Sequence, residues 1–286
     1  MKTILVPTDF SETAETAYDF AITLAKNLNS RLVLLHVYQN PAPVAEVPFD
    51  VLNDERRLLK EESEKTIKAL KMKMDYAGNL AYEYLSLEGE TRNIILTVAR
   101  EKKAELIIMG ATGQTGLSST LFGSISQSIM EKATCPVMAI PPGFTANKTI
   151  RKITYATDYH NSDITAIEKA AEIAAALHAQ LDILHISDAV IGADEEKSLM
   201  RHFMEKVKNT TSYNNLSFQI IHGYNVEERL EKYVEDGSTE MLLMATHYRD
   251  FIDKLFGRSI TRNIARTSTV PVVAFHFNAK TSVKLI

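Results

Sequence analysis

Residues 4–10 read ILVPTDF, and the pattern returns 149 residues later as ITYATDY in residues 153–159. The same spacing holds further along the chain at six more positions: Ala17, Ala21, Leu28, Leu32, Leu35 and His36 recur as Ala166, Ala170, Leu177, Leu181, Leu184 and His185. A long internal repeat constrains the architecture more strongly than any local pattern. We therefore expect the 286 residues to form two homologous domains in tandem.

The end of the repeat sets the domain limits. Residues 135–139 read CPVMA and are matched by VPVVA at 270–274, so the second copy is shorter by about 14 residues. We assign the missing residues to the proline-rich stretch 39–48, which reads as a surface loop of the first copy. Residues 141–147 read PPGFTAN, a linker rich in helix and strand breakers. The predicted domains are residues 1–144 and 150–280.

Strand and helix patterns alternate within each copy. Residues 3–8 form an apolar run without polar alternation, which is typical of a strand buried on both faces. Further strands are predicted at residues 32–37, 80–87, 106–109 and 136–140. Helical patterns occupy residues 14–28, 53–76, 91–103 and 124–133, the first with Ser11 as its predicted N-cap. This alternation predicts an α/β fold, with parallel sheets wrapped by helices. Ligands of such sheets bind beyond the carboxyl ends of the strands.

Composition restricts the class of protein. Hydrophobic residues make up 45% and charged residues 24%, which is typical of a globular chain and excludes a disordered one. The net charge of -4, with no basic excess in either half, argues against nucleic-acid binding. Cys135 is the only cysteine, and no apolar run is long enough for a signal peptide or a membrane span. We expect a cytoplasmic protein with neither nucleic acid nor membrane as partner.

A glycine-rich loop is the strongest functional signal. Residues 110–126 read GATGQTGLSSTLFGSIS, directly after a buried strand and leading into a helix. Glycines permit close backbone approach, and a helix N-terminus attracts anions, so the loop is suited to hold phosphate. It contains no Lys or Arg, which leaves backbone groups, hydroxyls and a divalent ion to hold the charge. It matches neither a Walker A loop nor a GxGxxG turn. The alternative is a glycine-rich loop that only caps a helix.

The spacing G-x2-G-x9-G-S, the strand end Pro7-Thr8-Asp9 and the tandem repeat resemble the universal stress protein family over essentially the whole chain. The resemblance implies two Rossmann-like domains of the adenine nucleotide alpha hydrolase-like class, each a five-stranded parallel sheet flanked by helices. It also implies ATP, with or without Mg²⁺, as ligand of the glycine-motif domain. The residues implied in binding are Pro7, Thr8, Asp9, Val37, Met109, Gly110, Gly113, Gly123, Ser124, Ile125 and Ser126.

The second copy departs from the motif. Ala245 and Tyr248 stand where the first copy has Gly110 and Gly113, and the span to Gly257 is one residue shorter. A tyrosine adopts the left-handed conformation at a cost, and its ring would fill phosphate space. We therefore predict that only the first copy binds ATP in the family manner.

Other chemistry-bearing residues have less specific patterns. His160 and His247 follow strands near Asp158, yet no zinc motif supports a metal site, and we predict none. His36 and His185 are interpreted as histidines bonded to backbone, and Cys135 as an inert core thiol. The HxGH and SGGxDS signatures of related acid-activating folds are absent, and no base or cation is placed beside Asp9.

The leading hypothesis is a tandem universal stress protein that binds ATP and regulates an unidentified protein partner, without acting mainly as a catalyst. The family resemblance implies that the last strands, 136–140 and 271–275, pair antiparallel within one chain as a pseudo-dimer. Association of two chains into a homodimer stays open. The rival hypotheses are a slow ATPase and a nucleotide-free adaptor with a metal or other ligand in its second domain.

Overall fold

The structure is a computed structural model that describes residues 2–39, 49–76, 78, 80–113, 123–187, 193–246 and 270–276. The first half alternates strand and helix in the order β1 (Thr3–Thr8), α1 (Glu12–Asn27), β2 (Arg31–Tyr38), α2 (Phe49–Tyr76), β3 (Tyr82–Glu88), α3 (Thr91–Glu101), β4 (Leu106–Gly110), α4 (Ser124–Lys132) and β5 (Val137–Ile140). The second half repeats it as β6 (Lys152–Thr157), α5 (Asn161–Leu177), β7 (Gln180–Ser187), α6 (Ala193–Thr210), β8 (Leu216–His222), α7 (Val226–Glu235), β9 (Met241–Thr246) and β10 (Val272–His276).

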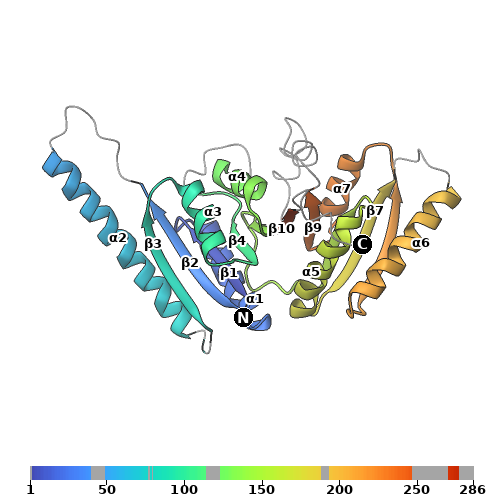
Figure 1. Cartoon of the computed structure of the whole chain (residues 1–286), viewed down its shortest axis with the longest axis horizontal. Coiled ribbons are helices and arrows are strands. Elements are labelled where there is room, and N and C mark those ends of the chain that lie inside the picture. Colours follow the sequence, from blue (N-terminus) through green and yellow to red (C-terminus); the bar gives the residue numbers. More distant parts are fainter. Residues whose placement is uncertain are drawn as a thin grey trace.

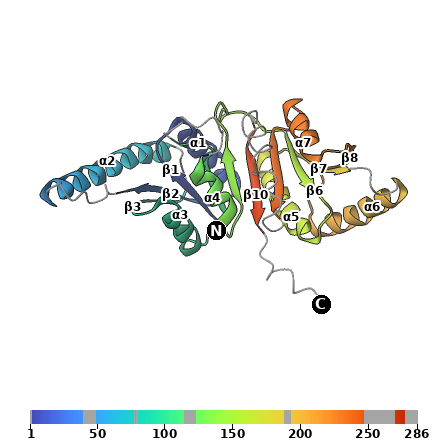
Figure 2. The ribbon, with the colours of Figure 1, turned by 90° about the horizontal axis from the view of Figure 1, so that it is seen from above.

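All ten strands form one sheet in the order β3-β2-β1-β4-β5-β10-β9-β6-β7-β8. Pairing is parallel within each half, which confirms the two Rossmann-like units. The halves join where β5 and β10 pair antiparallel, with Val273 opposite Met138. These are the last strands of each half, for which the family resemblance implied such a contact. Figures 1 and 2 show the halves side by side, with α2 and α6 at opposite ends.

Helices cover both faces of the sheet, so the inner strands are largely apolar, whereas the edge strands β3 and β8 carry polar residues and are only half-buried. On β1, Ile4 and Val6 belong to the core beneath α1, whereas Leu5 belongs to the core on the opposite face. Helix α1 has the predicted apolar stripe, and its N-cap is the predicted Ser11, whose Oγ accepts a hydrogen bond from Ala14 N. The core beneath α1 continues into the second half, which makes the two domains one packed body. Among the described residues, no helix combines the length and apolar character needed to cross a lipid bilayer.

The shortening of the second copy differs from the prediction. We expected it in the loop at residues 39–48, which lies outside the described residues. However, α2 has 28 residues and its counterpart α6 has 18, so most of the difference lies in the helix. Helix α2 begins at Phe49, earlier than its charged helical pattern at 53–76 indicates. The prolines drew attention to the loop, whereas a change in helix length leaves the local pattern unaltered.

Cys135 lies where the prediction of a core thiol placed it, with a buried side chain. Burial disfavours the thiolate and raises the pKa of Cys135 to about 11. The thiol is therefore protonated at pH 8, and its reactivity rises only as the pH approaches 11. We expect iodoacetamide at pH 8 to leave native protein unmodified and to alkylate the urea-unfolded chain rapidly, as measured by intact mass. Equal rates in the two states would contradict the buried position.

Candidate functional site

A cavity of about 490 Å³ opens at the carboxyl ends of β1, β2 and β4. It lies where the strand order changes direction between β1 and β4, the usual ligand position in such sheets. The structure brings all eleven residues of the sequence prediction into its lining: Pro7, Thr8, Asp9, Val37, Met109, Gly110, Gly113, Gly123, Ser124, Ile125 and Ser126. Its volume is in the range of small-molecule sites.

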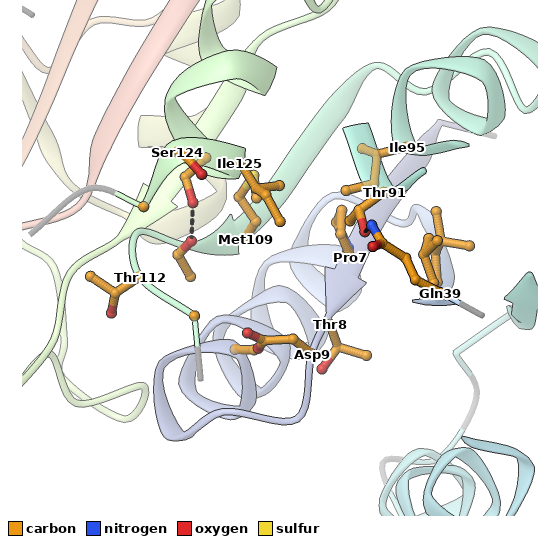
Figure 3. Close-up of a pocket in the computed structure, with 17 residues that line it drawn as sticks. Pro7, Thr8, Asp9, Gln39, Thr91, Ile95, Met109, Thr112, Ser124 and Ile125 are labelled. Carbon is orange, nitrogen blue, oxygen red and sulfur yellow. Dashed lines mark hydrogen bonds between the residues drawn. The ribbon is translucent and has the colours of Figure 1, made fainter. Parts of the chain in front are cut away.

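Six further residues line the cavity: Ala14, Leu35, Gln39, Thr91, Ile95 and Thr112. Figure 3 shows Gln39, Thr91 and Ile95 grouped at one end, and Thr112 and Ser124 toward the other. Leu35 and Val37 lie on β2, the strand that leads to Gln39, and add apolar side chains to the lining, which suits a flat aromatic ring. The glycine loop gives the second end its polar character. Sequence reasoning missed Thr91 and Ile95 of α3, because their place in the lining depends on how α3 packs against β2 and α4.

The end of β1 is a turn held by its own side chains. Thr8 Oγ1 accepts a hydrogen bond from Phe10 N at 3.0 Å, and Asp9 Oδ1 accepts from Ser11 N at 3.1 Å and Ser11 Oγ at 2.6 Å. Phe10 has a φ of 62°, a conformation that is rare outside glycine, and its ring lies 4.3 Å from that of His36. His36 Nδ1 donates to Thr8 O at 2.8 Å, which confirms the backbone-bonded role expected for His36. The Asp9 carboxylate is thus fixed in place before any ligand arrives.

The glycine at position 113 is required by a close approach to that carboxylate. A Cβ atom on Gly113 would lie 2.4 Å from Asp9 Oδ2, closer than any real side-chain contact. Gly110 is equally constrained, because its Cβ would lie 3.0 Å from backbone atoms of Thr13 and Ala14. Thr13 Oγ1 also donates to Thr112 O at 2.9 Å and ties the loop to α1. The first two glycines therefore allow the loop to pack against the β1–α1 turn.

The N-terminus of α4 faces the cavity without a side-chain cap. Gly123 is the N-cap residue and makes no side-chain hydrogen bond, so the first N–H groups of α4 are available to an anion. Ser124 and Ile125 line the cavity here. Ser126 has a different role, because its buried hydroxyl donates to Gly110 O at 2.9 Å and joins α4 to β4. We had expected this hydroxyl to serve as a phosphate donor; instead, its proton is already bonded.

Comparison with known proteins identifies the family. The model described as "Universal stress protein family" matches residues 1–141 and again residues 149–276. The chain belongs to the universal stress protein family.

A universal stress protein of Methanocaldococcus jannaschii is 34% identical over 142 residues, which cover 49% of this chain and 81% of that protein. A universal stress protein of Synechocystis is 24% identical over 297 residues, covering 96% of this chain and 100% of its own length. Among solved structures, a universal stress protein from Archaeoglobus fulgidus superposes with a TM-score of 0.75 at 19% identity, over 97% of each chain. The tandem arrangement of the two domains therefore recurs in full-length relatives.

The second universal stress protein domain keeps the turn at the end of its first strand. The cavity at the repeat position of the first domain's site is much smaller than the 490 Å³ cavity. Tyr159 stacks on His185 at 4.1 Å, and His185 Nδ1 donates to Thr157 O at 2.8 Å, as expected for a backbone-bonded histidine. The cavity lined by Ala156, Thr157 and Ala245, at the repeat position of the first domain's site, measures about 120 Å³. A second cavity of about 380 Å³, lined by Asp158, His185 and Glu196 among others, adjoins it. The predicted departures at Tyr248 and Gly257 lie outside the described residues.

The buried carboxylate of Asp163 occupies part of the space that is open in the first domain. Asp163 occupies the repeat position of Ala14, lines the small cavity, and accepts hydrogen bonds from Tyr155 Oη at 3.0 Å and Thr157 Oγ1 at 2.5 Å. It is 1% exposed. The larger Asp163 side chain therefore fills space that the first domain leaves open at Ala14. The replacement of Ala14 by Asp163 could have been found from the sequence, because the two residues are 149 positions apart, the offset of the repeat.

Metal-binding groups are sparse in the part of the chain that the structure describes, where no cluster of three or more His, Cys, Asp or Glu side chains fits a metal ion. His160 is the N-cap of α5, and its ring accepts a hydrogen bond from Ser162 N. His247, the second histidine considered for such a site, lies outside the described residues. Among the described residues that line the first domain's cavity, Asp9 is the one carboxylate. A Mg²⁺ ion there would rely on phosphate oxygens and water, with Asp9 as its protein ligand.

Proposed function

We propose that the first universal stress protein domain binds ATP in the 490 Å³ cavity. The observation that carries the proposal is the convergence of the eleven predicted residues on one cavity. Its apolar lining residues, among them Leu35, Val37 and Ile95, suit the adenine ring. The N-terminus of α4 suits the phosphates, because its first backbone N–H groups have no partner within the helix and Gly123 supplies no side-chain cap.

We propose further that bound ATP regulates the protein and is not turned over. Asp9 is the cavity residue nearest in type to a general base, and its Oδ1 already accepts two hydrogen bonds from Ser11. Those bonds make the Asp9 carboxylate part of the turn, which argues against a role in taking a proton from an attacking water. ATP then acts by favouring one conformation of the domain, which a protein partner reads in the stress response.

The second domain is proposed as a derived partner that does not bind ATP. Its small cavity and the Asp163 carboxylate support this assignment. The domain instead completes the sheet, because β10 pairs with β5 of the first domain. One chain thus contains one nucleotide site.

Isothermal titration of the full chain tests the proposal. We expect one ATP site per chain, and weaker binding of cAMP, the ligand in the solved complex of another universal stress protein. Incubation with ATP and Mg²⁺ should release no phosphate above the rate in buffer. Two sites per chain would overturn the assignment of the second domain. No binding of any adenine nucleotide would favour the adaptor hypothesis, and steady phosphate release would favour the slow ATPase.

A further inference from the structure

The glycine loop lacks basic residues, yet the fold brings a cation to its end. Arg92 is the second residue of α3, and its Nη2 donates to Ser124 Oγ at 3.4 Å. Ser124 begins α4 and lines the cavity. We propose that Arg92 binds the phosphate chain of the nucleotide, which makes it the residue that distinguishes phosphorylated ligands from the bare nucleoside. This inference rests on the proposed ATP function of the first domain.

The surroundings of Arg92 leave its charge available. Its Nε atom is buried and has no hydrogen-bond partner among the described residues. Within the same part of the chain, the Ser124 contact is its one hydrogen bond and no carboxylate pairs with it. A phosphate stabilises a guanidinium that has no carboxylate partner, because charge-assisted hydrogen bonds to phosphate oxygens are stronger than neutral ones. The position of Arg92 therefore suits an anion held at Ser124.

Neighbouring residues on α3 place Arg92 at the rim of the cavity. Thr91, one residue earlier, and Ile95, one turn later, both line the cavity. Helix α4 presents its positive end at Ser124, beside the guanidinium, whereas the N-terminus of α3 is capped by the Glu90 carboxylate, which accepts a hydrogen bond from Asn93 N at 2.9 Å. Asp9 is the one acidic side chain among the lining residues that the structure describes. The positive end of α4 and the Arg92 guanidinium therefore both favour an anion at the α4 end of the cavity.

The second domain provides an internal comparison. Helix α7 repeats α3 at an offset of 135 residues, so that the buried Ile95, Val98 and Ala99 correspond to Leu230, Tyr233 and Val234. At this offset Arg92 corresponds to Glu227, a reversal of charge. The reversal accompanies Asp163 in the place of Ala14 and the reduced cavity. The domain that has lost the features of a phosphate site also has an acid where the first domain has Arg92.

Titration of Arg92 variants of the full chain with ATP and with adenosine tests the assignment. We expect Arg92→Gln to weaken ATP about tenfold, the size of one charge-assisted hydrogen bond, and to leave adenosine unchanged. Arg92→Glu, which copies the second domain, should weaken ATP further, and Arg92→Lys should recover part of the loss. The control is Arg100→Gln in the last turn of α3, where the guanidinium donates hydrogen bonds to Leu96 O and Thr97 Oγ1 of its own helix. This control should bind both ligands like the wild type.

Salt dependence gives a second readout, because a purely structural role would not change it. ATP affinity of the wild type should fall more steeply with added salt than that of Arg92→Gln. Equal loss of ATP and adenosine, or unchanged ATP binding, would overturn the role of Arg92 and leave nucleotide binding itself intact. A wild type that binds neither ligand would overturn both this inference and the proposed function.

Discussion

Gly113→Val is expected to lower ATP affinity at least about 100-fold, a change of roughly 2.7 kcal/mol, while the chain stays folded. The new Cβ would lie 2.4 Å from Asp9 Oδ2. Asp9 cannot move away cheaply, because Ser11 holds the other carboxylate oxygen through two hydrogen bonds. The loop must therefore retreat from the β1 turn, and the isopropyl group enters the space where backbone N–H groups meet phosphate.

The matched control for this variant is Gly123→Ala. A Cβ atom at Gly123 would meet its nearest neighbour, Ala111 O, at 3.7 Å, an ordinary contact. We expect Gly123→Ala to retain most of the affinity in the same titration, and thermal unfolding to show that both variants are folded. ATP binding by Gly113→Val at the wild-type level would show that the glycine loop is only a helix cap.

Val273→Asp is expected to destabilise the whole chain by about 4 kcal/mol or more, enough to unfold most proteins. Val273 is 0% exposed on β10, opposite Met138 of β5 and Leu243 of β9. A carboxylate there loses its water among the apolar residues of β5 and β9. Because β10 joins the two halves of the sheet, the variant should lose ATP binding as well as its own domain's structure.

Urea unfolding measures this effect, with Val273→Ala as a milder variant expected to cost about 2 kcal/mol. Val226→Asp is the control, since Val226 is 39% exposed at the start of α7 and should change the free energy of unfolding by about 0.5 kcal/mol or less. If Val273→Asp unfolded at the same urea concentration as the wild type, the placement of β10 between β5 and β9 in the centre of the sheet would be contradicted.

The structural features that could be predicted from the sequence are those that depend on a short local pattern or on the internal repeat. The strands of the first half, the Ser11 N-cap and the backbone-bonded His36 and His185 all follow from short stretches with one physical interpretation. The repeat added the tandem arrangement. The family resemblance supplied the residue list for the site, and those residues lie around one cavity.

The features that sequence reasoning missed depend on which distant segments meet. Arg92 and Ser124 are 32 residues apart, and only the packing of α3 beside α4 brings the guanidinium to the loop. The hydroxyl of Ser126 could bond to phosphate or to the strand, and the structure selects Gly110 O. The difference in length between α2 and α6 changes no local signal, because both helices have the same polar and charged character.

Hydrogen exchange of the full chain with and without ATP tests the central claim, one nucleotide site in the first domain and none in the second. The account predicts slower exchange in peptides from the ends of β1 and β4 and the first turn of α4, around Asp9, Gly113 and Ser124. Peptides from the matching edge of the second domain, around Asp158 and Ala245, should exchange at unchanged rates. Protection of the second edge, or identical exchange throughout at saturating ATP, would contradict the account.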